Sequence, residues 1–142
     1  MDQPIVCHTV PQLNSYLKLF SKLAAEHGVF FALDDQLHLL SQLSVTSNKQ
    51  TEIVIDPRQL LTKLITKETK FLIVIHNHPS GKCFPSKADY QTTFKLIATG
   101  ELIGFQLLDH LIVTNTSYFS FSESGLIEEL KTGPFKDSSQ IC

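Results

Sequence analysis

Two histidines and an aspartate stand at a spacing typical of metal ligands. His76 and His78 form an H-x-H pair, and after seven further residues the pattern Ser86-x-x-Asp89 follows. Two imidazoles and one carboxylate supply three N/O ligands and leave the fourth tetrahedral position of a zinc ion open to water, as in catalytic zinc sites. The sequence therefore predicts one Zn²⁺ per chain, bound by His76, His78 and Asp89.

A strand, a tight loop and the start of a helix must bring these ligands together. Residues 70–75 form a continuous apolar, β-branched run, which predicts a strand buried on both faces that ends at His76. Side chains two apart on an extended backbone point to the same side, and Pro79 favours extension at His78. The chain can turn beyond the proline, and the following helix start carries Asp89 in its first turn.

The same residues also have simpler interpretations. Ser86-x-x-Asp89 is a capping box as well, in which the serine accepts a hydrogen bond from a backbone N–H and the carboxylate bonds back to the cap. A histidine that ends a strand is usually an ordinary surface or core residue. The combination of two same-side histidines with a carboxylate at loop-closing distance favours the metal site.

Three other polar residues are harder to assign. Asp109-His110 lies between apolar stretches and could orient a metal ligand, but local hydrogen bonding by aspartate favours a turn or strand kink there. Cys83 lies inside the loop and could compete for metal or be oxidised. It is left out of the predicted site, because an unassigned loop thiol is more often incidental.

The stretch from His76 to Asp89 is similar to the signature of the JAMM (JAB1/MPN) metalloproteases. HNHPSG, together with Leu107-Leu108-Asp109-His110, resembles specifically the RadC-like branch of that family. The similarity extends over residues 26–121. The segment Asp56-Pro57-Arg58-Gln59 resembles the family's helix start, although its first and last residues differ from the usual histidine and glutamate.

The resemblance implies roles for the site residues. It implies that His76, His78 and Asp89 bind zinc, that Glu26 is the general base for the zinc-bound water, and that Ser86 stabilises the oxyanion of a tetrahedral intermediate. Zinc lowers the pKa of bound water to about 7, so a nearby carboxylate can complete its deprotonation. From the residues alone, Glu26 would be interpreted as a solvated side chain at a helix end.

Two classes of function follow from the resemblance. The favoured one is a zinc-dependent metallohydrolase, a JAMM-type metallopeptidase or isopeptidase acting on a peptide, isopeptide or other amide. The alternative is a non-catalytic RadC-like binding module associated with DNA repair or replication. Full-length RadC-like proteins carry a helix-hairpin-helix region before this domain. Only 25 residues precede Glu26, so the chain resembles the catalytic-type domain alone.

Composition limits the class of protein. A chain of 142 residues with 42% hydrophobic content predicts one domain over residues 1–142, with a flexible tail at 131–142. Three scattered cysteines argue for a reducing compartment, and no apolar run approaches the roughly 20 residues of a membrane span. A cytoplasmic protein is expected. The net charge of −2 and a single arginine do not support direct nucleic-acid binding, and the strand pattern does not specify an oligomeric state.

The remaining patterns predict an alternation of helices and strands. Helices are expected over residues 10–25, capped by Thr9, over 56–65, and over 86–99, closed by Gly100. Strands are expected over residues 29–33, 37–45, 53–55, 70–76, 105–113 and 118–121. The expected apolar helix faces are Leu13, Leu17, Phe20 and Ala24 in the first helix, and Leu60, Leu61, Leu64 and Ile65 in the second.

This order of elements indicates an α/β (α+β) sandwich with a mixed, largely antiparallel sheet flanked by helices. The resemblance narrows the prediction to the JAB/MPN, cytidine-deaminase-like fold. Cytidine deaminases themselves are excluded, because their zinc sites need P-C-x-x-C and H-x-E, and neither occurs in the sequence.

Overall fold

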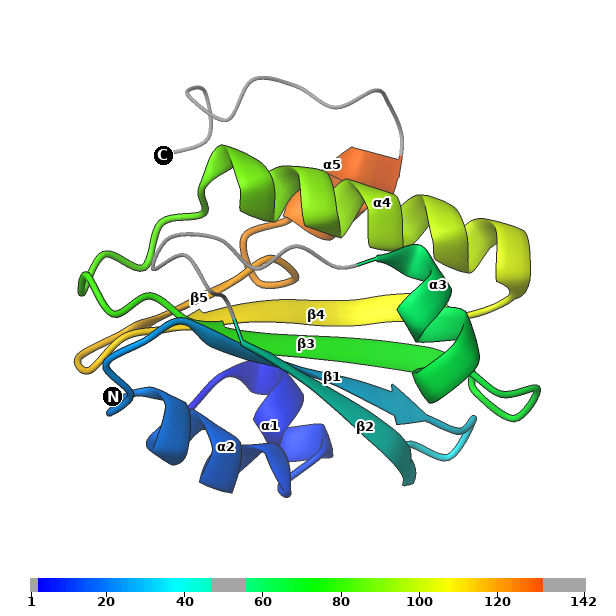
Figure 1. The fold of residues 1–142 in the computed structure, drawn as a ribbon, viewed down its shortest axis with the longest axis horizontal. Coiled ribbons are helices and arrows are strands. Elements are labelled where there is room, and N and C mark those ends of the chain that lie inside the picture. The colour runs from blue at the N-terminus through cyan, green and yellow to red at the C-terminus, as the bar shows by residue number, and fades with distance from the viewer. Residues whose placement is uncertain (1–2, 47–55, 132–142) are drawn as a thin grey trace.

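The computed structural model describes residues 3–46 and 56–131. Within them, one sheet contains β1 (His27–Leu33), β2 (Leu39–Thr46), β3 (Phe71–Asn77), β4 (Gln106–Val113) and β5 (Tyr118–Ser120), in the order β2-β1-β3-β4-β5 (Figure 1). β3 and β4 are parallel, and the other neighbouring pairs are antiparallel. The predicted mixed, largely antiparallel sheet flanked by helices is confirmed.

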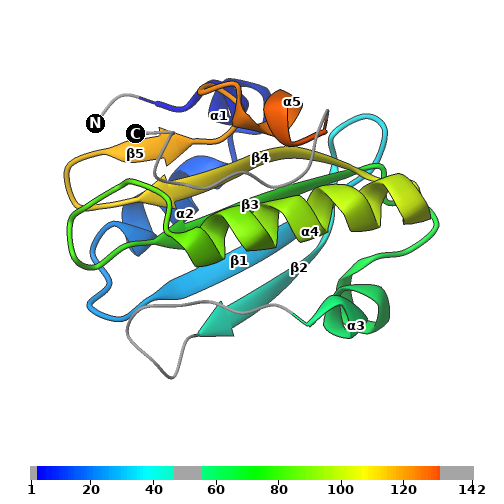
Figure 2. The same cartoon turned by 90° about the horizontal axis from the view of Figure 1, so that it is seen from above.

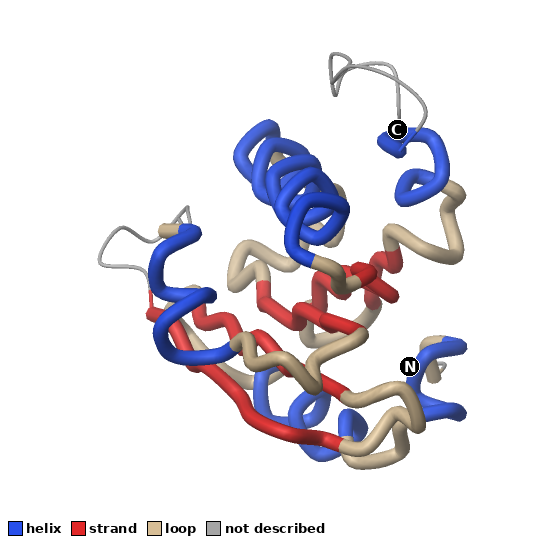
Figure 3. The backbone as a smooth tube through the Cα atoms, turned by 90° about the vertical axis from the view of Figure 1, so that its right-hand side faces the viewer, coloured by secondary structure: helices blue, strands red, loops and turns tan. Residues whose placement is uncertain are grey.

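Helices cover both faces of the sheet. α1 (Ile5–Thr9) and α2 (Leu13–Phe20) lie on one face, and α4 (Lys87–Ile103) and α5 (Leu126–Lys131) lie on the other (Figures 2 and 3). α3 (Pro57–Gln59) continues into a π-helical turn, η1 (Leu60–Leu64), which contacts β2. Within the described ranges, no helix is long and apolar enough to cross a membrane.

β3 lies at the centre of the sheet and has an apolar core on each side. Leu72 and Val74 belong to the core under α4, whereas Ile73 and Ile75 belong to the core under α2. This division follows from the alternation of side chains along a strand, and it explains why the run is apolar at every position. The predicted strand buried on both faces is confirmed, and it ends at Asn77, one residue later than predicted.

The predicted single helix over residues 10–25 is wrong, because two short helices occupy the N-terminal region. Thr9 is the last residue of α1 and does not cap the next helix. Pro11 has no N–H to donate to a carbonyl one turn earlier, so α1 does not continue through it. α2 ends at Phe20, which leaves Ala24 outside the helix and exposed. The rest of the predicted apolar face is buried: Leu13, Leu17 and Phe20.

α4 continues beyond the end predicted at Thr99. Gly104, with a φ of 112°, is its left-handed C-cap, and the N–H groups of Gly104 and Phe105 both donate to the carbonyl of Gly100. Gly100 therefore lies inside the helix. A Cβ placed on Gly100 would come within 2.3 Å of the carbonyl oxygen of Phe105. The missing side chain allows the chain to turn closely into β4.

Smaller differences occur at α3 and at the C-terminal end. The helix start at Asp56 is confirmed, since its carboxylate accepts a hydrogen bond from the N–H of Arg58. The following turn is wider than an α-helix, with the N–H of Ile65 bonded to the carbonyl of Leu60, and Leu61 is exposed rather than part of the apolar face. α5 has no counterpart in the sequence predictions. The predicted extended piece at 53–55 and the tail from 132 on lie outside the described residues.

Replacement of Gly100 by alanine tests the close turn between α4 and β4. Alanine is normally favoured over glycine inside a helix by about 1 kcal/mol. We expect Gly100→Ala instead to lower the free energy of unfolding by about 1–3 kcal/mol, because the new methyl group forces Phe105 to move. Urea unfolding measures this change. Glu101→Ala, at an exposed neighbouring position, is the control, and equal or greater stability of Gly100→Ala would contradict the packing.

Candidate metal centre

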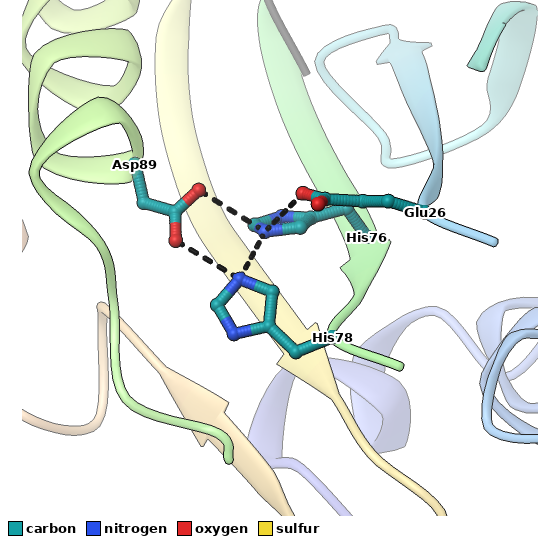
Figure 4. Close-up of side chains that lie close together, drawn as sticks. All are labelled: Glu26, His76, His78 and Asp89. Atoms are coloured by element: carbon teal, nitrogen blue, oxygen red, sulfur yellow. Dashed lines mark hydrogen bonds and ion pairs between the residues drawn. The ribbon is translucent and has the colours of Figure 1, made fainter. Parts of the chain in front are cut away.

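Four side chains from three parts of the chain meet at one end of β3. His76 and His78 come from the end of this strand, Asp89 from the first turn of α4, and Glu26 from the residue before β1 (Figure 4). One ligand atom from each of the four lies within 4.8 Å of those of the others. The structure thus brings together the three predicted ligands and the predicted base.

The contacts within this group are short. Nε2 of His76 lies 3.1 Å from Nε2 of His78 and 3.1 Å from Oδ1 of Asp89, and Nε2 of His78 lies 3.1 Å from Oδ2 of Asp89. Oε1 of Glu26 is 3.8 Å from Nε2 of His76. Glu26, His76 and Asp89 are buried, whereas His78 is partly exposed. The group therefore lies at the edge of the core.

The chemistry of the donor atoms fits a metal ion. Nδ1 of His78 lies 2.9 Å from the carbonyl oxygen of Lys82. A carbonyl oxygen only accepts hydrogen bonds, so Nδ1 carries the hydrogen and the neutral ring directs the lone pair of Nε2 toward the group. Two imidazole nitrogens and a carboxylate oxygen are a donor set that suits zinc. His76, His78 and Asp89, with Glu26 beside them, could hold such an ion.

The charges in the group are strongly coupled. Burial opposes ionisation of Asp89, but its contacts with the imidazoles of His76 and His78 outweigh burial and hold the pKa of this carboxyl well below its usual range. Burial likewise disfavours protonation of His78, but the hydrogen bond and the charge of Asp89 outweigh burial and raise its pKa. Positive charge is therefore favoured beside Asp89, whether protons or a metal ion supply it.

Ser86 and Asp89 form the capping box that was the simpler interpretation of their spacing. The N–H of Asp89 donates to Oγ of Ser86 at 3.1 Å, and the N–H of Ser86 donates to Oδ2 of Asp89 at 2.8 Å. The same carboxylate contacts both histidines. The Asp89 carboxylate therefore caps α4 and contacts the two histidines at the same time, and the cap holds the carboxylate in place.

Glu26 is buried, so its interpretation as a solvated side chain is wrong. The reason is Asn77, the middle residue of the H-x-H pair. Its Oδ1 accepts from the N–H of His27 at 2.6 Å, and its Nδ2 donates to the carbonyls of Leu23 and Ala25 at 3.3 and 3.0 Å. These bonds fix the backbone on both sides of Glu26. No role was predicted for Asn77 from the sequence, although strand alternation directs its side chain away from those of the two histidines.

Asp109 and His110 make different contacts: Asp109 bonds to nearby groups, whereas His110 contacts His76. The pairing of β4 with β3 has a register shift at Leu108, and β4 continues through Asp109 and His110 without a turn. Asp109 accepts from the hydroxyl of Ser120 and from backbone N–H groups, and burial raises its pKa to about 6. Nε2 of His110 lies 2.7 Å from Nδ1 of His76, so His110 is the residue of this pair that contacts a predicted ligand. Burial, and then the charge of His76, lower the pKa of His110 to about 3.

A hollow of about 240 Å³ lies next to the group. Glu26, His78 and Ser86 face it, and the loop between β3 and α4 supplies the rest of its wall, including the exposed residues Lys82 and Phe84. Cys83 in the same loop is a half-buried free thiol and does not belong to the ligand group. The predicted base and the serine therefore both border this hollow beside the loop.

The fold and the site together define the class of the protein, an α+β domain of JAB/MPN type with a Glu-His-His-Asp group that could hold a metal ion. The chain matches the family model of the RadC-like JAB domain over residues 7–126 and belongs to that family.

The chain is also similar to proteins that carry the name UPF0758. The chain is 39% identical over 102 residues to a UPF0758 protein of Chlorobaculum parvum, covering 72% of this chain and 46% of the relative. It is 34% identical over 115 residues to a UPF0758 protein of Staphylococcus haemolyticus, covering 81% and 50% respectively. These names specify no activity. The chain spans about half the length of the curated relatives it matches.

Removal of the Asn77 side chain tests how Glu26 is positioned. Asn77→Ala breaks three hydrogen bonds and leaves buried backbone groups without their partner, so we expect the free energy of unfolding to fall by about 1–3 kcal/mol. Denaturant unfolding of the purified protein measures this. Asn115→Ala, at an exposed turn, should change stability by less than about 0.5 kcal/mol. Equal effects of the two substitutions would show that Asn77 does not hold this segment.

Proposed function

We propose that this protein is a zinc-dependent hydrolase of amide bonds, a metallopeptidase or isopeptidase of the JAMM type. The observation that carries the proposal is the convergence of His76, His78 and Asp89 with a further buried carboxylate, Glu26, beside a hollow lined by Ser86. Three N/O ligands plus an additional acid-base group are what metal-assisted hydrolysis requires. Membership of the RadC-like JAB domain family supports the same class of reaction.

The chain's own residues would divide the chemistry between them. A bound zinc ion would lower the pKa of a coordinated water to about 7 and polarise a substrate carbonyl. Glu26 would take a proton as the water oxygen bonds to the carbonyl carbon, and would pass that proton to the nitrogen as the C–N bond breaks. The products are a carboxylic acid and an amine.

Ser86 would support the negative charge that develops on the carbonyl oxygen. Its Oγ already accepts from the N–H of Asp89, which fixes the position of the oxygen and leaves the hydroxyl proton available as a donor. Ser86 also faces the same hollow as Glu26 and His78. Peptides, isopeptides and other amides all present the carbonyl group that this arrangement needs.

Metal content tests the proposed ligands. After loading with zinc and removal of excess, elemental analysis should find about one zinc per chain, and His76→Ala and Asp89→Ala should each abolish it, because two remaining ligands hold zinc weakly. His38→Ala is the matched control, since His38 also contacts an aspartate, Asp34, but lies on the exposed hairpin between β1 and β2. Full zinc content in His76→Ala would overturn the assignment.

Glu26→Gln tests catalysis separately from metal binding. The assay follows release of aminocoumarin from a panel of N-acetylated peptide amides, together with cleavage of an ε-linked lysine isopeptide. Loss of the base should reduce the rate by about 10²–10⁴-fold while zinc content stays at the wild-type level. Glu101→Gln, on an exposed part of α4, should leave the rate unchanged. An unchanged rate in Glu26→Gln would contradict the proposed role, and zinc-loaded protein that cleaves none of these amides would favour the non-catalytic RadC-like module.

A further inference from the structure

A chain of hydrogen bonds leads from the metal centre into the core. Nδ1 of His76 lies 2.7 Å from Nε2 of His110, and Nδ1 of His110 lies 2.7 Å from Oγ1 of Thr93. That Oγ1 lies 2.8 Å from the carbonyl oxygen of Asp89. Thr93 is 0% exposed, His110 1% and His76 3%, so water does not compete for these bonds. This series of hydrogen bonds connects β3, β4 and α4. It begins at one predicted ligand, His76, and ends at another, Asp89.

The last acceptor determines the direction of every bond in the chain. A carbonyl oxygen carries no hydrogen, so the hydroxyl of Thr93 must donate to Asp89. Oγ1 of Thr93 is then the acceptor for His110, whose Nδ1 must carry a hydrogen. The ring of His110 is buried between a hydroxyl oxygen and another imidazole, where the neutral form with one hydrogen is favoured. Its Nε2 therefore accepts, and Nδ1 of His76 must donate.

We propose that Thr93 and His110 are positioning residues that set the tautomer of His76. With its hydrogen held on Nδ1, His76 directs the lone pair of Nε2 toward His78 and Asp89. A histidine binds a metal ion only through a ring nitrogen that lacks hydrogen, so this tautomer prepares the ligand. The effect on metal affinity rests on the proposed function, whereas the tautomer itself is a property of the metal-free protein.

The two histidines of the centre are oriented by different means. His78 lies nearer the surface and donates to the carbonyl of Lys82 in the adjacent loop. His76 is buried and depends on side chains of the core. The ring of His110 is held flat against Phe121, with centroids 4.8 Å apart and an angle of 9° between the planes. Stacking therefore fixes the direction in which Nε2 of His110 points.

A pair of substitutions at Thr93 separates the hydroxyl from the packing. Thr93→Val keeps the shape but removes the acceptor for His110. The hydrogen of His110 is then better placed on Nε2, where it donates to His76 and moves the hydrogen of His76 onto the nitrogen that faces the centre. We expect the dissociation constant for zinc, measured by chelator competition, to rise about 10–100-fold. Thr93→Ser keeps the hydroxyl and should bind zinc as the wild type does.

Long-range ¹H–¹⁵N NMR spectra of the metal-free protein, labelled at histidine, report the tautomers directly. Wild type and Thr93→Ser should carry the hydrogen of His110 on Nδ1, and Thr93→Val should carry it on Nε2. A wild-type His110 with its hydrogen on Nε2, or equal zinc affinities of folded Thr93→Val and Thr93→Ser, would overturn the proposal. If no variant binds zinc, the proposed function fails, and the wild-type spectrum still decides the tautomer. The same spectrum decides it if Thr93→Val does not fold.

Discussion

Side chains alternate across a β-strand, and at the end of β3 this alternation divides three consecutive polar residues between two tasks. His76 and His78 point together toward Asp89, while Asn77 bonds the backbone of residues 23, 25 and 27. That backbone carries Glu26, whose side chain lies beside His76. A shift of β3 by one residue would exchange these tasks and separate all four groups. The register of the central strand is therefore the constraint on which the site depends.

The cores on the two faces of the sheet hold that register. Every residue of β3 from Leu72 to Ile75 is buried in one core or the other. β4 pairs with β3 along its full length, and β1 pairs with it up to His76. The polar residues His76, Asn77 and His78 follow directly after the apolar run of β3. Each of them therefore lies at the edge of the core, where it can bond to a polar partner. Asp89 is fixed independently by the cap of α4. A rigid strand end and a rigid helix start thus face each other across a short loop.

The sequence was most informative where the rules are local. The alternation of His76 and His78, the cap at Ser86 and the position of Asp89 in the first helical turn depend only on nearby residues, and the structure brings them together as expected. The role of Glu26 was predicted only from the resemblance to the RadC-like family. Its burial follows from the bonds of Asn77 to the backbone on both sides of Glu26. No local pattern reveals these bonds, because Asn77 lies about 50 residues away in the sequence.

Other features depend on packing between distant segments. The contact of His110 with His76 requires the parallel pairing of β3 with β4. The choice between Gly100 and Gly104 as the end of α4 rests on where Phe105 packs, since either glycine is an acceptable helix end by composition. The break between α1 and α2 could have been predicted from Pro11, because proline has no N–H to continue a helix that precedes it.

Anomalous diffraction at the zinc absorption edge, from crystals of the zinc-loaded protein, tests the central claim most directly. We expect one strong peak at the end of β3, about 2.0–2.2 Å from Nε2 of His76, Nε2 of His78 and an oxygen of Asp89, with no other protein ligand. A peak elsewhere, or no peak at this group when zinc is in excess, would contradict the claim that these side chains form a metal centre.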